Sequence, residues 1–330
     1  MTGEADFRTL TPEAVIDAVE SLGLRADGRV LALNSYENRV LRVGLEDSAP
    51  VVAKFYRPAR WSDAQILEEH AFVAELAAAE VPAVPPLALR GATLHHAAGF
   101  AFSVFPRQGG RVPNLDDADV LEWIGRFLGR IHAVGAARPY AERPALDQDR
   151  FGREPRVFLL AGDWLPRELR AVYAGVSQQA LDGVARAFER AGAVRALRLH
   201  GDVHEGNLLW TDGAGRSGPH FVDFDDSRMG PAVQDFWMLL GRERDEQLAR
   251  LAALVTGYED FAEFDRRELH LVEALRTLRL LHYTAWIAGR WHDPAFPAAF
   301  PWFGTQRYWE ERILELREQV AALDEAPLVV

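Results

Sequence analysis

The sequence predicts an α+β protein in which a β-rich first part is followed by a mainly helical second part. Apolar residues alternate in the first third of the chain, whereas from about residue 116 onward they recur at helical spacing. The segment 106–110, Pro-Arg-Gln-Gly-Gly, separates the two patterns and is the best candidate for a hinge. With 330 residues, of which 48% are hydrophobic, the chain can bury a substantial core in two lobes. We therefore expect domains at residues 1–106 and 107–330.

The first part is predicted to begin with a short helix and to continue as an antiparallel sheet. Proline in the run Thr11-Pro12-Glu13 is typical of the first helical position. Alternation then predicts strands at 29–33, 39–43, 50–56 and 99–105. The first two strands are joined by the polar turn 34–38, and Ser62-Asp63 can cap a helix over 64–80.

Lys54 lies inside the strand 50–56, on the same face as Val52 and Tyr56. A buried lysine is costly unless it meets an anion, and an exposed strand face is the alternative interpretation. Its place in the third strand, after a turn-linked pair, favours contact with a phosphate. Glu68 and Glu69 on the following helix are available as its partners.

The second part is predicted to be helical. Apolar residues recur at helical spacing in five segments, near 116–134, 177–190, 233–258, 264–290 and 305–323. The sequence has no internal repeat and no low-complexity linker. A β-rich part joined to an α-rich part argues for a two-lobed α+β protein.

The most informative run is His200-Gly201-Asp202-Val203-His204-Glu205-Gly206-Asn207. Asp202 is followed five positions later by an Asn, which is the spacing between the proton-accepting Asp and a Mg²⁺-binding Asn in kinase catalytic loops. A later apolar run, 221–224, contains Asp223, which would meet the metal as the Asp of Asp-Phe-Gly does. The connection 211–219 is rich in turn residues, so the two motifs are expected side by side. Together they predict phosphoryl transfer from ATP with Mg²⁺.

Other interpretations of this run are weaker. Gly-Asp is a common turn, and a single His is usually structural. Dinuclear metallophosphoesterases hold metals with Asp-x-His and Gly-Asn-His elements, but no second such element follows here. A zinc protease needs His-Glu-x-x-His on one helical face, whereas Gly201 lies between His200 and His204. The spacing and Asp223 together favour the kinase interpretation.

The composition argues against several other classes of protein. Its 37 basic and 49 acidic residues give a formal charge of −12, which repels nucleic acid and anionic membranes. The absence of cysteine excludes disulfides, thiolate nucleophiles and cysteine metal sites. The acidic, polar residues 1–6 are not typical of a signal peptide, and no apolar run reaches the length of a membrane span. We expect a soluble, cytoplasmic monomer with neither nucleic-acid nor membrane partners.

The run 200–207 resembles the catalytic loop of the aminoglycoside- and choline-kinase-like branch of the protein-kinase fold. Within that branch, residues 221–226 and 230–240 are similar to the bacterial stress response kinase A family. The segments 34–40 and 290–303 are similar to the same family, so the resemblance spans nearly the whole chain. It implies a bilobal protein-kinase-like fold and a Ser/Thr protein kinase that can autophosphorylate.

The resemblance also implies roles for individual residues. Asp202 and Asp223 would be catalytic, with Asp202 accepting the proton and Asp223 binding Mg²⁺ together with Asn207. Lys54 would contact the α- and β-phosphates of ATP, and Ser35 would touch ATP from the first turn.

Two further residues receive supporting roles from the same resemblance. Glu69 would hold Lys54 toward the nucleotide, because its distance from the helix exit at Val81-Pro82 is usual in small kinase-like proteins. Asp235 would hold the catalytic loop.

The chain departs from ordinary protein kinases at several positions. The turn 34–38 replaces a Gly-rich loop, Gly201 replaces the Arg of His-Arg-Asp, and Asp225 replaces the Gly of Asp-Phe-Gly. No activation loop is evident between Asp223 and Asp235, which argues against activation by phosphorylation.

Two other features leave alternatives open. His204 is expected to steer phosphate or to brace the loop, and a purely structural role is equally open. The aromatic residues of the segment 291–309 are expected to serve packing rather than to form a wall of the substrate site.

Three functions remain open from the sequence. The first is an ATP- and Mg²⁺-dependent Ser/Thr protein kinase of stress-response type. The second is a kinase for an amino alcohol, a sugar or an aminoglycoside, in which the acidic residues 225, 226 and 235 could serve a cationic substrate. The third is a pseudokinase, against which the intact residues Asp202, Asn207 and Asp223 argue.

Overall fold

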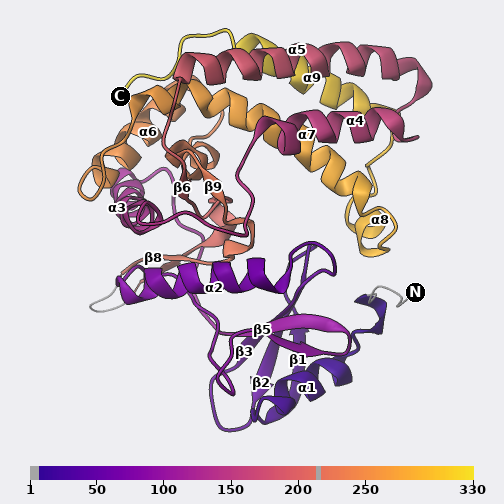
Figure 1. The fold of residues 1–330 in the computed structure, drawn as a ribbon, viewed down its shortest axis with the longest axis vertical. Coiled ribbons are helices and arrows are strands. Elements are labelled where there is room, and N and C mark those ends of the chain that lie inside the picture. Colours follow the sequence, from indigo (N-terminus) through magenta and orange to yellow (C-terminus); the bar gives the residue numbers. More distant parts are fainter. Residues whose placement is uncertain (1–6, 213–216) are drawn as a thin grey trace. The chain divides into compact units, whose positions relative to one another are not determined.

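The computed structural model describes residues 7–212 and 217–330, which divide into two compact units (Figure 1). Unit 1 consists of the described residues within Met1–Asn114, Tyr140–Arg143 and His204–Ser227. Unit 2 consists of those within Leu115–Pro139, Pro144–Val203 and Arg228–Val330. Asp202 therefore belongs to unit 2, whereas Asn207 and Asp223 belong to unit 1. The expected domain boundary between residues 106 and 107 stays a prediction. The predictions made for residues 1–6, and for 213–216 within the connection 211–219, lie outside the described residues.

Unit 1 is built on an antiparallel sheet with the strand order β1-β2-β3-β5-β4. Its strands are β1 (Ala26–Ala32), β2 (Arg39–Leu45), β3 (Val51–Phe55), β4 (His95–Ala97) and β5 (Phe100–Pro106). In the register, Lys54 of β3 lies opposite Val40 of β2 and Ser103 of β5. The predicted α+β class with an antiparallel sheet is confirmed.

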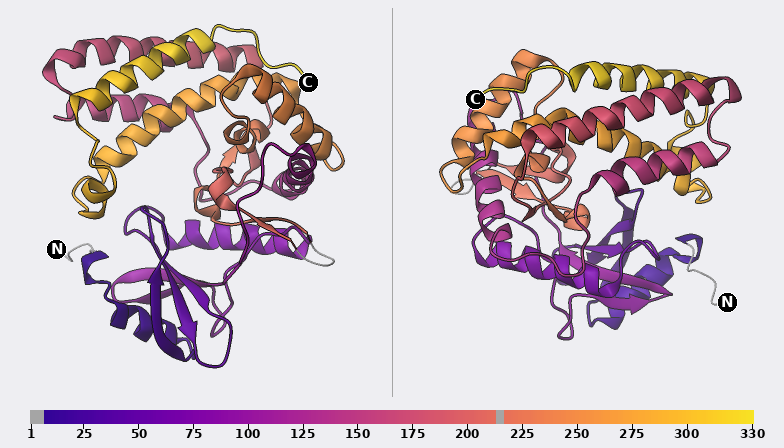
Figure 2. Two further views of the ribbon diagram at one scale, coloured as in Figure 1. Left: turned by 180° about the vertical axis from the view of Figure 1, so that it is seen from behind. Right: turned by 45° about the horizontal axis from the view of Figure 1, so that its top comes forward.

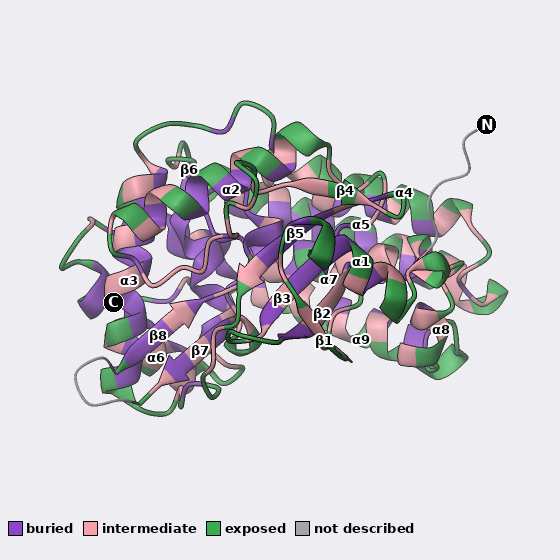
Figure 3. Ribbon diagram, turned by 90° about the horizontal axis from the view of Figure 1, so that it is seen from below, coloured by how far each residue is buried: buried purple, intermediate pink, exposed green. Residues whose placement is uncertain are grey.

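The alternation of β3 works as the sequence predicts. Val51, Ala53 and Phe55 pack into the hydrophobic core of unit 1, so the opposite face carries Lys54. The helix α1 (Pro12–Ser21) adds Val15 to the same core. Figure 3 shows β3 mostly buried, whereas β1 alternates between intermediate and exposed residues.

A second helix and a hairpin complete unit 1. The helix α2 (Asp63–Ala78) begins with a capping box in which Ser62 and Gln65 satisfy each other's backbone amides. The hairpin of β7 (Leu208–Thr211) and β8 (Gly218–Phe221) pairs its arms as predicted. The amide of Phe221 also donates to the carbonyl of Pro82 at 2.8 Å, which ties the hairpin to the chain after α2.

Unit 2 is mainly helical, and Figure 2 shows α5 and α9 running beside each other. Its helices are α3 (Ala118–Gly135), α4 (Glu154–Ala161), α5 (Arg167–Ala191), α6 (Arg244–Tyr258), α7 (Val272–Gly289), α8 (Ala295–Ala299) and α9 (Gln306–Ala322). The short strands β6 (Leu197–Arg198) and β9 (Met229–Gly230) pair within this unit. The aromatic residues Phe296, Phe300 and Trp309 pack into its core, which is the packing role that we expected.

The helices α3 and α6 approach with their backbones in contact. A Cβ atom at Gly125 would meet the carbonyl of Leu254, and one at Gly257 would meet the carbonyl of Glu122. Glycine is required at such a crossing because it has no side chain to hold the backbones apart.

Two helical predictions need correction. The segment 233–258 is not one helix, because short 3-10 helices, Ala232–Asp235 and Trp237–Leu239, precede α6. Successive buried residues from Ala232 to Trp237 cannot share one helical stripe, so the chain turns more tightly here. The segment 264–290 likewise begins with a 3-10 helix, Arg266–Leu271, before α7.

Among the described residues, no helix is both long and apolar enough to span a membrane.

Candidate active site

Unit 1 contains a cavity of about 290 Å³ that receives five of the sequence-predicted site residues. Its walls are Leu33, Val40, Val52, Val73, Val84 and Phe105, and its polar lining includes Ser35, Lys54, Glu69, Asn207 and Asp223. Apolar walls with a few convergent polar groups are typical of small-molecule sites. The cavity can therefore hold a flat apolar ring against the sheet and an anionic group near Lys54.

Lys54 is the buried cation of this cavity. Its Nζ donates to Oδ1 of Asp223 at 2.7 Å and lies 3.2 Å from Oδ1 of Asp225. Burial acts to lower the pKa of Lys54, but Asp223 and Asp225 outweigh it and hold this pKa well above its usual value. Lys54 is thus a permanent positive charge in the cavity.

Asp225 is the inner carboxylate of the cluster, and only 4% of it is exposed. It forms an ion pair with Arg60 and accepts a hydrogen bond from Nδ2 of Asn38 at 3.1 Å. Burial raises its pKa, but Arg60 and Lys54 outweigh burial and bring it down to about 2. Asp225 therefore stays ionised and anchors both cations.

The predicted ion pair between Lys54 and Glu69 needs correction. Nη2 of Arg143 donates to Oε2 of Glu69 at 3.1 Å, while the bonds of Lys54 go to Asp223 and Asp225. Burial raises the pKa of Glu69 to about 7, although Arg143 and Lys54 oppose that shift. Glu69 lines the cavity near Lys54, but its ion-pair partner is Arg143 rather than Lys54.

Asp223 is the accessible carboxylate of the cluster, with 47% of its side chain exposed. Its backbone lies in the left-handed region, with φ at 62° and ψ at 65°, which is uncommon for a residue other than glycine. The amide of the preceding Val222 donates to the carbonyl of Asn207 at 3.1 Å, so Asn207 and Asp223 follow adjacent arms of the hairpin. The structure brings these two predicted metal ligands to one cavity.

The donor set of the cavity fits Mg²⁺. One carboxylate and one amide oxygen are hard ligands, and protein Mg²⁺ sites usually take one or two carboxylates plus phosphates and water. The described residues contain no group of three or more His, Cys, Asp or Glu side chains that could hold a metal alone. Phosphate and water oxygens would supply the remaining ligands of such an ion.

Ser35 and His204 lie in loops of unit 1. Ser35 is half-buried in the turn between β1 and β2 and lines the cavity. Nδ1 of His204 accepts a hydrogen bond from the amide of Gly206 at 3.0 Å and so caps the short 3-10 helix Glu205–Asn207. This contact favours the bracing role for His204.

Asp202 lies in unit 2, where its Oδ1 accepts a hydrogen bond from Nη1 of Arg279 on α7 at 2.6 Å. Arg279 follows Asp202 by 77 residues, so nothing in the local sequence indicated this contact.

Asp235 holds the chain just before Asp202. Its two carboxylate oxygens accept hydrogen bonds from the amides of His200 and Gly201, both at 2.8 Å. Nε2 of His132 on α3 lies 3.0 Å from the same carboxylate. These contacts provide the loop-holding function that the resemblance implied for Asp235.

The acidic residues considered for a cationic substrate are committed elsewhere. Asp235 is fully buried, and Asp225 is enclosed by Lys54 and Arg60. Asp226 accepts a hydrogen bond from Arg60 at 2.9 Å. The idea that these three carboxylates bind a cationic acceptor is therefore not supported by their positions.

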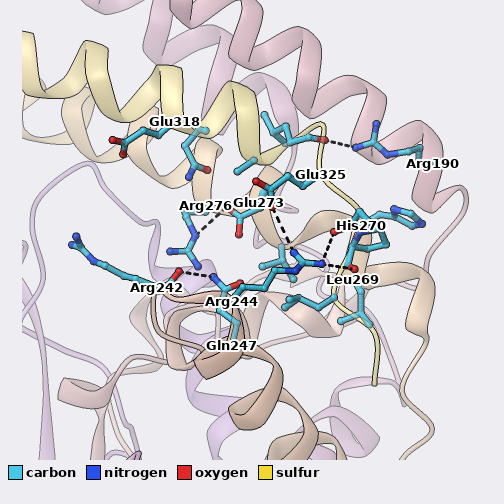
Figure 4. A pocket seen from close by; sticks show the side chains of 17 residues that line it. Arg190, Arg242, Arg244, Gln247, Leu269, His270, Glu273, Arg276, Glu318 and Glu325 are labelled. Atoms are coloured by element: carbon cyan, nitrogen blue, oxygen red, sulfur yellow. Dashed lines mark hydrogen bonds and ion pairs between the residues drawn. The ribbon is translucent and has the colours of Figure 1, made fainter.

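A second cavity, of about 310 Å³, lies in unit 2 and contains none of the predicted site residues (Figure 4). Two of its arginines donate hydrogen bonds to backbone carbonyls of the C-terminal segment. Nη2 of Arg244 donates to Ala326 at 2.8 Å and to Pro327 at 3.0 Å, and Arg190 donates to Leu323 at 2.8 Å. We therefore interpret these arginines as structural.

Sequence reasoning missed the partners of Asp225 and Glu69, namely the buried Asn38 and Arg143 and the partly buried Arg60. Asn38 was recognised as part of the polar turn 34–38, but nothing marked it as a partner of Asp225. Arg143 lies in a loop after α3, where a lone arginine has no signal of its own. The one available signal was Asp225 itself, an acidic residue directly after a buried Phe224.

A family model and the sequences of relatives place this chain in a known group. Residues 29–272 match the model described as the phosphotransferase enzyme family. The chain is 43% identical over 322 residues to stress response kinase A of Escherichia coli strain K12, covering 98% of this chain and 96% of the relative. At the same identity and coverage it is similar to a Salmonella typhimurium protein named serine/threonine protein kinase RdoA.

Solved structures share the fold at lower sequence identity. A structure of the amicoumacin kinase hAmiN in complex with AMP-PNP, Ca²⁺ and Ami has a TM-score of 0.73 at 18% identity, covering 99% of this chain and 97% of that one. A microcompartment-associated aminopropanol kinase has a TM-score of 0.68 at 20% identity, covering 94% and 96%. At these identities the likeness shows the fold alone.

Proposed function

Because the chain belongs to the phosphotransferase enzyme family and, within it, to the stress response kinase A group, we propose that it is an ATP- and Mg²⁺-dependent Ser/Thr protein kinase that also autophosphorylates. The observation that carries this proposal is the buried Lys54 held by Asp223 in a cavity that also contains Asn207. A cation, a carboxylate and an amide are the groups that orient and neutralise the phosphates of ATP.

Each residue then has a defined task. Lys54 exchanges its bond to Asp223 for the α- and β-phosphates, while Asp225 keeps its ammonium group in place. Asn207 and Asp223 would hold Mg²⁺, which supplies charge neutralisation on the phosphate oxygens. Asp202 accepts the proton of the acceptor hydroxyl, and Asp235 fixes the loop that carries it.

A protein acceptor is supported by the name of the Salmonella typhimurium relative, which at 43% identity is far more similar than any solved structure compared above. A role in stress responses is supported by the Escherichia coli relative. A cytoplasmic, monomeric state remains the prediction from the sequence.

A small-molecule kinase is the second candidate. It is favoured by the solved structures of the same fold, which include kinases of amicoumacin and aminopropanol. These proteins share the fold, but their sequence identity is too low for their substrates to be assigned to this chain.

The decisive experiment measures transfer of label from γ-labelled ATP to protein and to small acceptors. Wild-type protein with Mg²⁺ is expected to label itself and a generic protein acceptor. Asp202→Ala should lower transfer by about 10²–10⁴-fold, because a positioned general base is worth that much. Asp324→Ala is the matched control, since it removes an exposed carboxylate that pairs with Arg186.

Three results would change the conclusion. Transfer by Asp202→Ala within a few-fold of wild type would exclude Asp202 as the base. Label on amino alcohols, sugars or aminoglycosides but not on protein would favour the second candidate. Absence of ADP formation with Mg²⁺ would indicate a pseudokinase.

A further inference from the structure

The carboxylate proposed as the general base is held by an arginine. Nη1 of Arg279 lies 2.6 Å from Oδ1 of Asp202, and 17% of the Asp202 side chain but 43% of the Arg279 side chain is exposed. A guanidinium at this distance stabilises the carboxylate and opposes the arrival of a proton on it. The acceptor must therefore meet Arg279 when its hydroxyl approaches Asp202.

A partly buried cluster of His282, Phe151 and Arg228 lies next to this ion pair in unit 2. His282 follows Arg279 by one helical turn on α7, and its ring lies 4.5 Å from that of Phe151. The guanidinium of Arg228 lies 4.7 Å from the ring of Phe151. The backbone carbonyl of Arg228 accepts a hydrogen bond from the amide of Leu199 at 2.9 Å. The backbone of Arg228 is thus bonded to the residue that precedes the run 200–207.

Two acidic residues of the segment that contains Phe151 pair with arginines of the same segment. Asp149 accepts a hydrogen bond from Arg153 at 2.6 Å, and Asp147 lies 3.7 Å from Arg150. Each carboxylate is therefore matched by an arginine of its own segment.

We infer that Arg279 is the binding site for an anionic group on the acceptor, so that the preferred substrate is a Ser or Thr with an acidic side chain close to it. This inference rests on the proposed kinase function and names its substrate class. When the acidic group takes the guanidinium, the ion pair with Arg279 no longer opposes the transfer of the hydroxyl proton to Asp202.

The transfer step then balances as follows. The acceptor oxygen forms a bond to the γ-phosphorus while the bond from that phosphorus to the bridging oxygen of ADP breaks. ADP leaves with the electron pair of the broken bond, and the hydroxyl proton passes to Asp202. No further reactant is needed.

The geometry limits where the acidic group can lie. The guanidinium of Arg279 must reach the acidic group while it lies beside Asp202. Asp202 must at the same time lie within hydrogen-bond distance of the hydroxyl oxygen. Because an extended chain spans about 3.3–3.6 Å per residue, the acidic residue should lie roughly one or two positions from the phosphorylated Ser.

The experiment compares three peptides of equal length in which a single Ser is flanked on both sides by Asp, by Asn or by Lys. Wild-type protein is expected to phosphorylate the Asp peptide with a kcat/KM about tenfold or more above that of the Lys peptide, as a charge-assisted hydrogen bond gives. Arg279→Glu should reverse or abolish this ranking, whereas Arg279→Lys should retain part of it. Arg317→Glu, an exposed charge reversal on α9, is the matched control and should keep the wild-type ranking.

Two results would overturn the inference. One is an identical ranking of the three peptides by wild type and by Arg279→Glu. The other is a higher KM for ATP in Arg279→Gln with the peptide ranking unchanged, which would assign Arg279 to the nucleotide.

A binding measurement separates this inference from the proposed function. Fluorescence anisotropy of the labelled peptides, with protein saturated by ADP and Mg²⁺, reports the anion site without any transfer. Tighter binding of the Asp peptide than of the Lys peptide, lost in Arg279→Glu, would support the inference even if no peptide were phosphorylated. Equal binding of the two peptides by wild type would refute it, whereas absence of all transfer contradicts the kinase proposal.

Discussion

The polar groups of the two units are held together in different ways. In unit 1, Lys54 and Asp225 belong to a cluster of ion pairs, one member of which, Asp223, is half exposed. In unit 2, the fully buried Asp235 holds the backbone amides of His200 and Gly201. Ion pairs can exchange a partner for a ligand, whereas a carboxylate that binds amides inside the core fixes a backbone. The cluster of unit 1 can therefore exchange a partner, whereas Asp235 of unit 2 keeps a loop in one conformation.

We expect the largest effect on stability from the loss of Asp235 in unit 2. Asp235→Ala leaves two buried amides without an acceptor, so we expect the free energy of unfolding to fall by about 3–5 kcal/mol. Urea denaturation measures this change. The exposed Asp324→Ala should cost less than about 1 kcal/mol, because surface ion pairs contribute little. Equal losses for the two variants would refute the claim that Asp235 is a structural clamp.

Lys54→Met tests the cluster of ion pairs in unit 1. We expect a loss of about 2–3 kcal/mol in the free energy of unfolding, less than for Asp235→Ala, because Asp225 keeps its bonds to Arg60 and Asn38. The kcat/KM for ATP should fall by about 100-fold, since the α- and β-phosphates lose their cation. Denaturation and steady-state kinetics on one preparation give both numbers. A stability loss larger than that of Asp235→Ala would reverse the comparison.

The pH dependence of stability offers a smaller effect in unit 2. Burial raises the pKa of Glu268 from 4.5 to about 7, although hydrogen bonds such as that from the amide of Val233 oppose the shift. Between these two values the folded state keeps a proton that the unfolded state has lost, so the free energy of unfolding falls as pH rises through this window.

Glu268→Gln should therefore flatten the stability profile between about pH 5 and pH 8, by about 1–2 kcal/mol relative to wild type. Urea denaturation at both pH values measures the difference, and comparison with wild type removes the contribution of other titrating groups. A profile as steep as that of wild type would show that Glu268 is ionised in the folded protein.

Helix caps give the smallest effect and compare the units directly. Ser62 accepts a hydrogen bond from the amide of Gln65 at the start of α2, and Thr305 accepts one from Tyr308 at the start of α9. Replacing either residue by Ala should cost about 1 kcal/mol. If the two units unfold separately, Ser62→Ala should shift one transition in thermal denaturation and Thr305→Ala the other. A single transition shifted by both would indicate that the units unfold together.

Much of this architecture could be predicted from the sequence, for reasons that differ between regions. The strand with Lys54 is long enough for alternation to show, and the structure places the face opposite Lys54 in the core. Asp202 and Asn207 lie in one short run of the sequence, so their spacing could be recognised without a structure. By contrast, β6 and β9 are two residues long, which is too short for any periodicity to be detected.

The partners of the candidate site were the least predictable feature. Arg60 and Arg143 reach Asp225 and Glu69 from distant parts of the chain, and Arg279 reaches Asp202 from another helix. A surface arginine and a buried one look alike in a sequence, because the pattern of neighbouring residues does not say which carboxylate will be near. The replacement of Glu69 by Asp225 as the partner of Lys54 is of this kind.

The crossing of α3 and α6 has a consequence for reading mutational maps. Gly125 and Gly257 touch no ligand, yet a methyl group at either position would collide with the backbone of the opposite helix. A saturation screen for kinase activity would thus mark both codons as intolerant, much like those of Asp202 and Asp223. A screen that reads the amount of folded protein alongside activity would separate the two groups, since variants of the glycines would fail in both readouts.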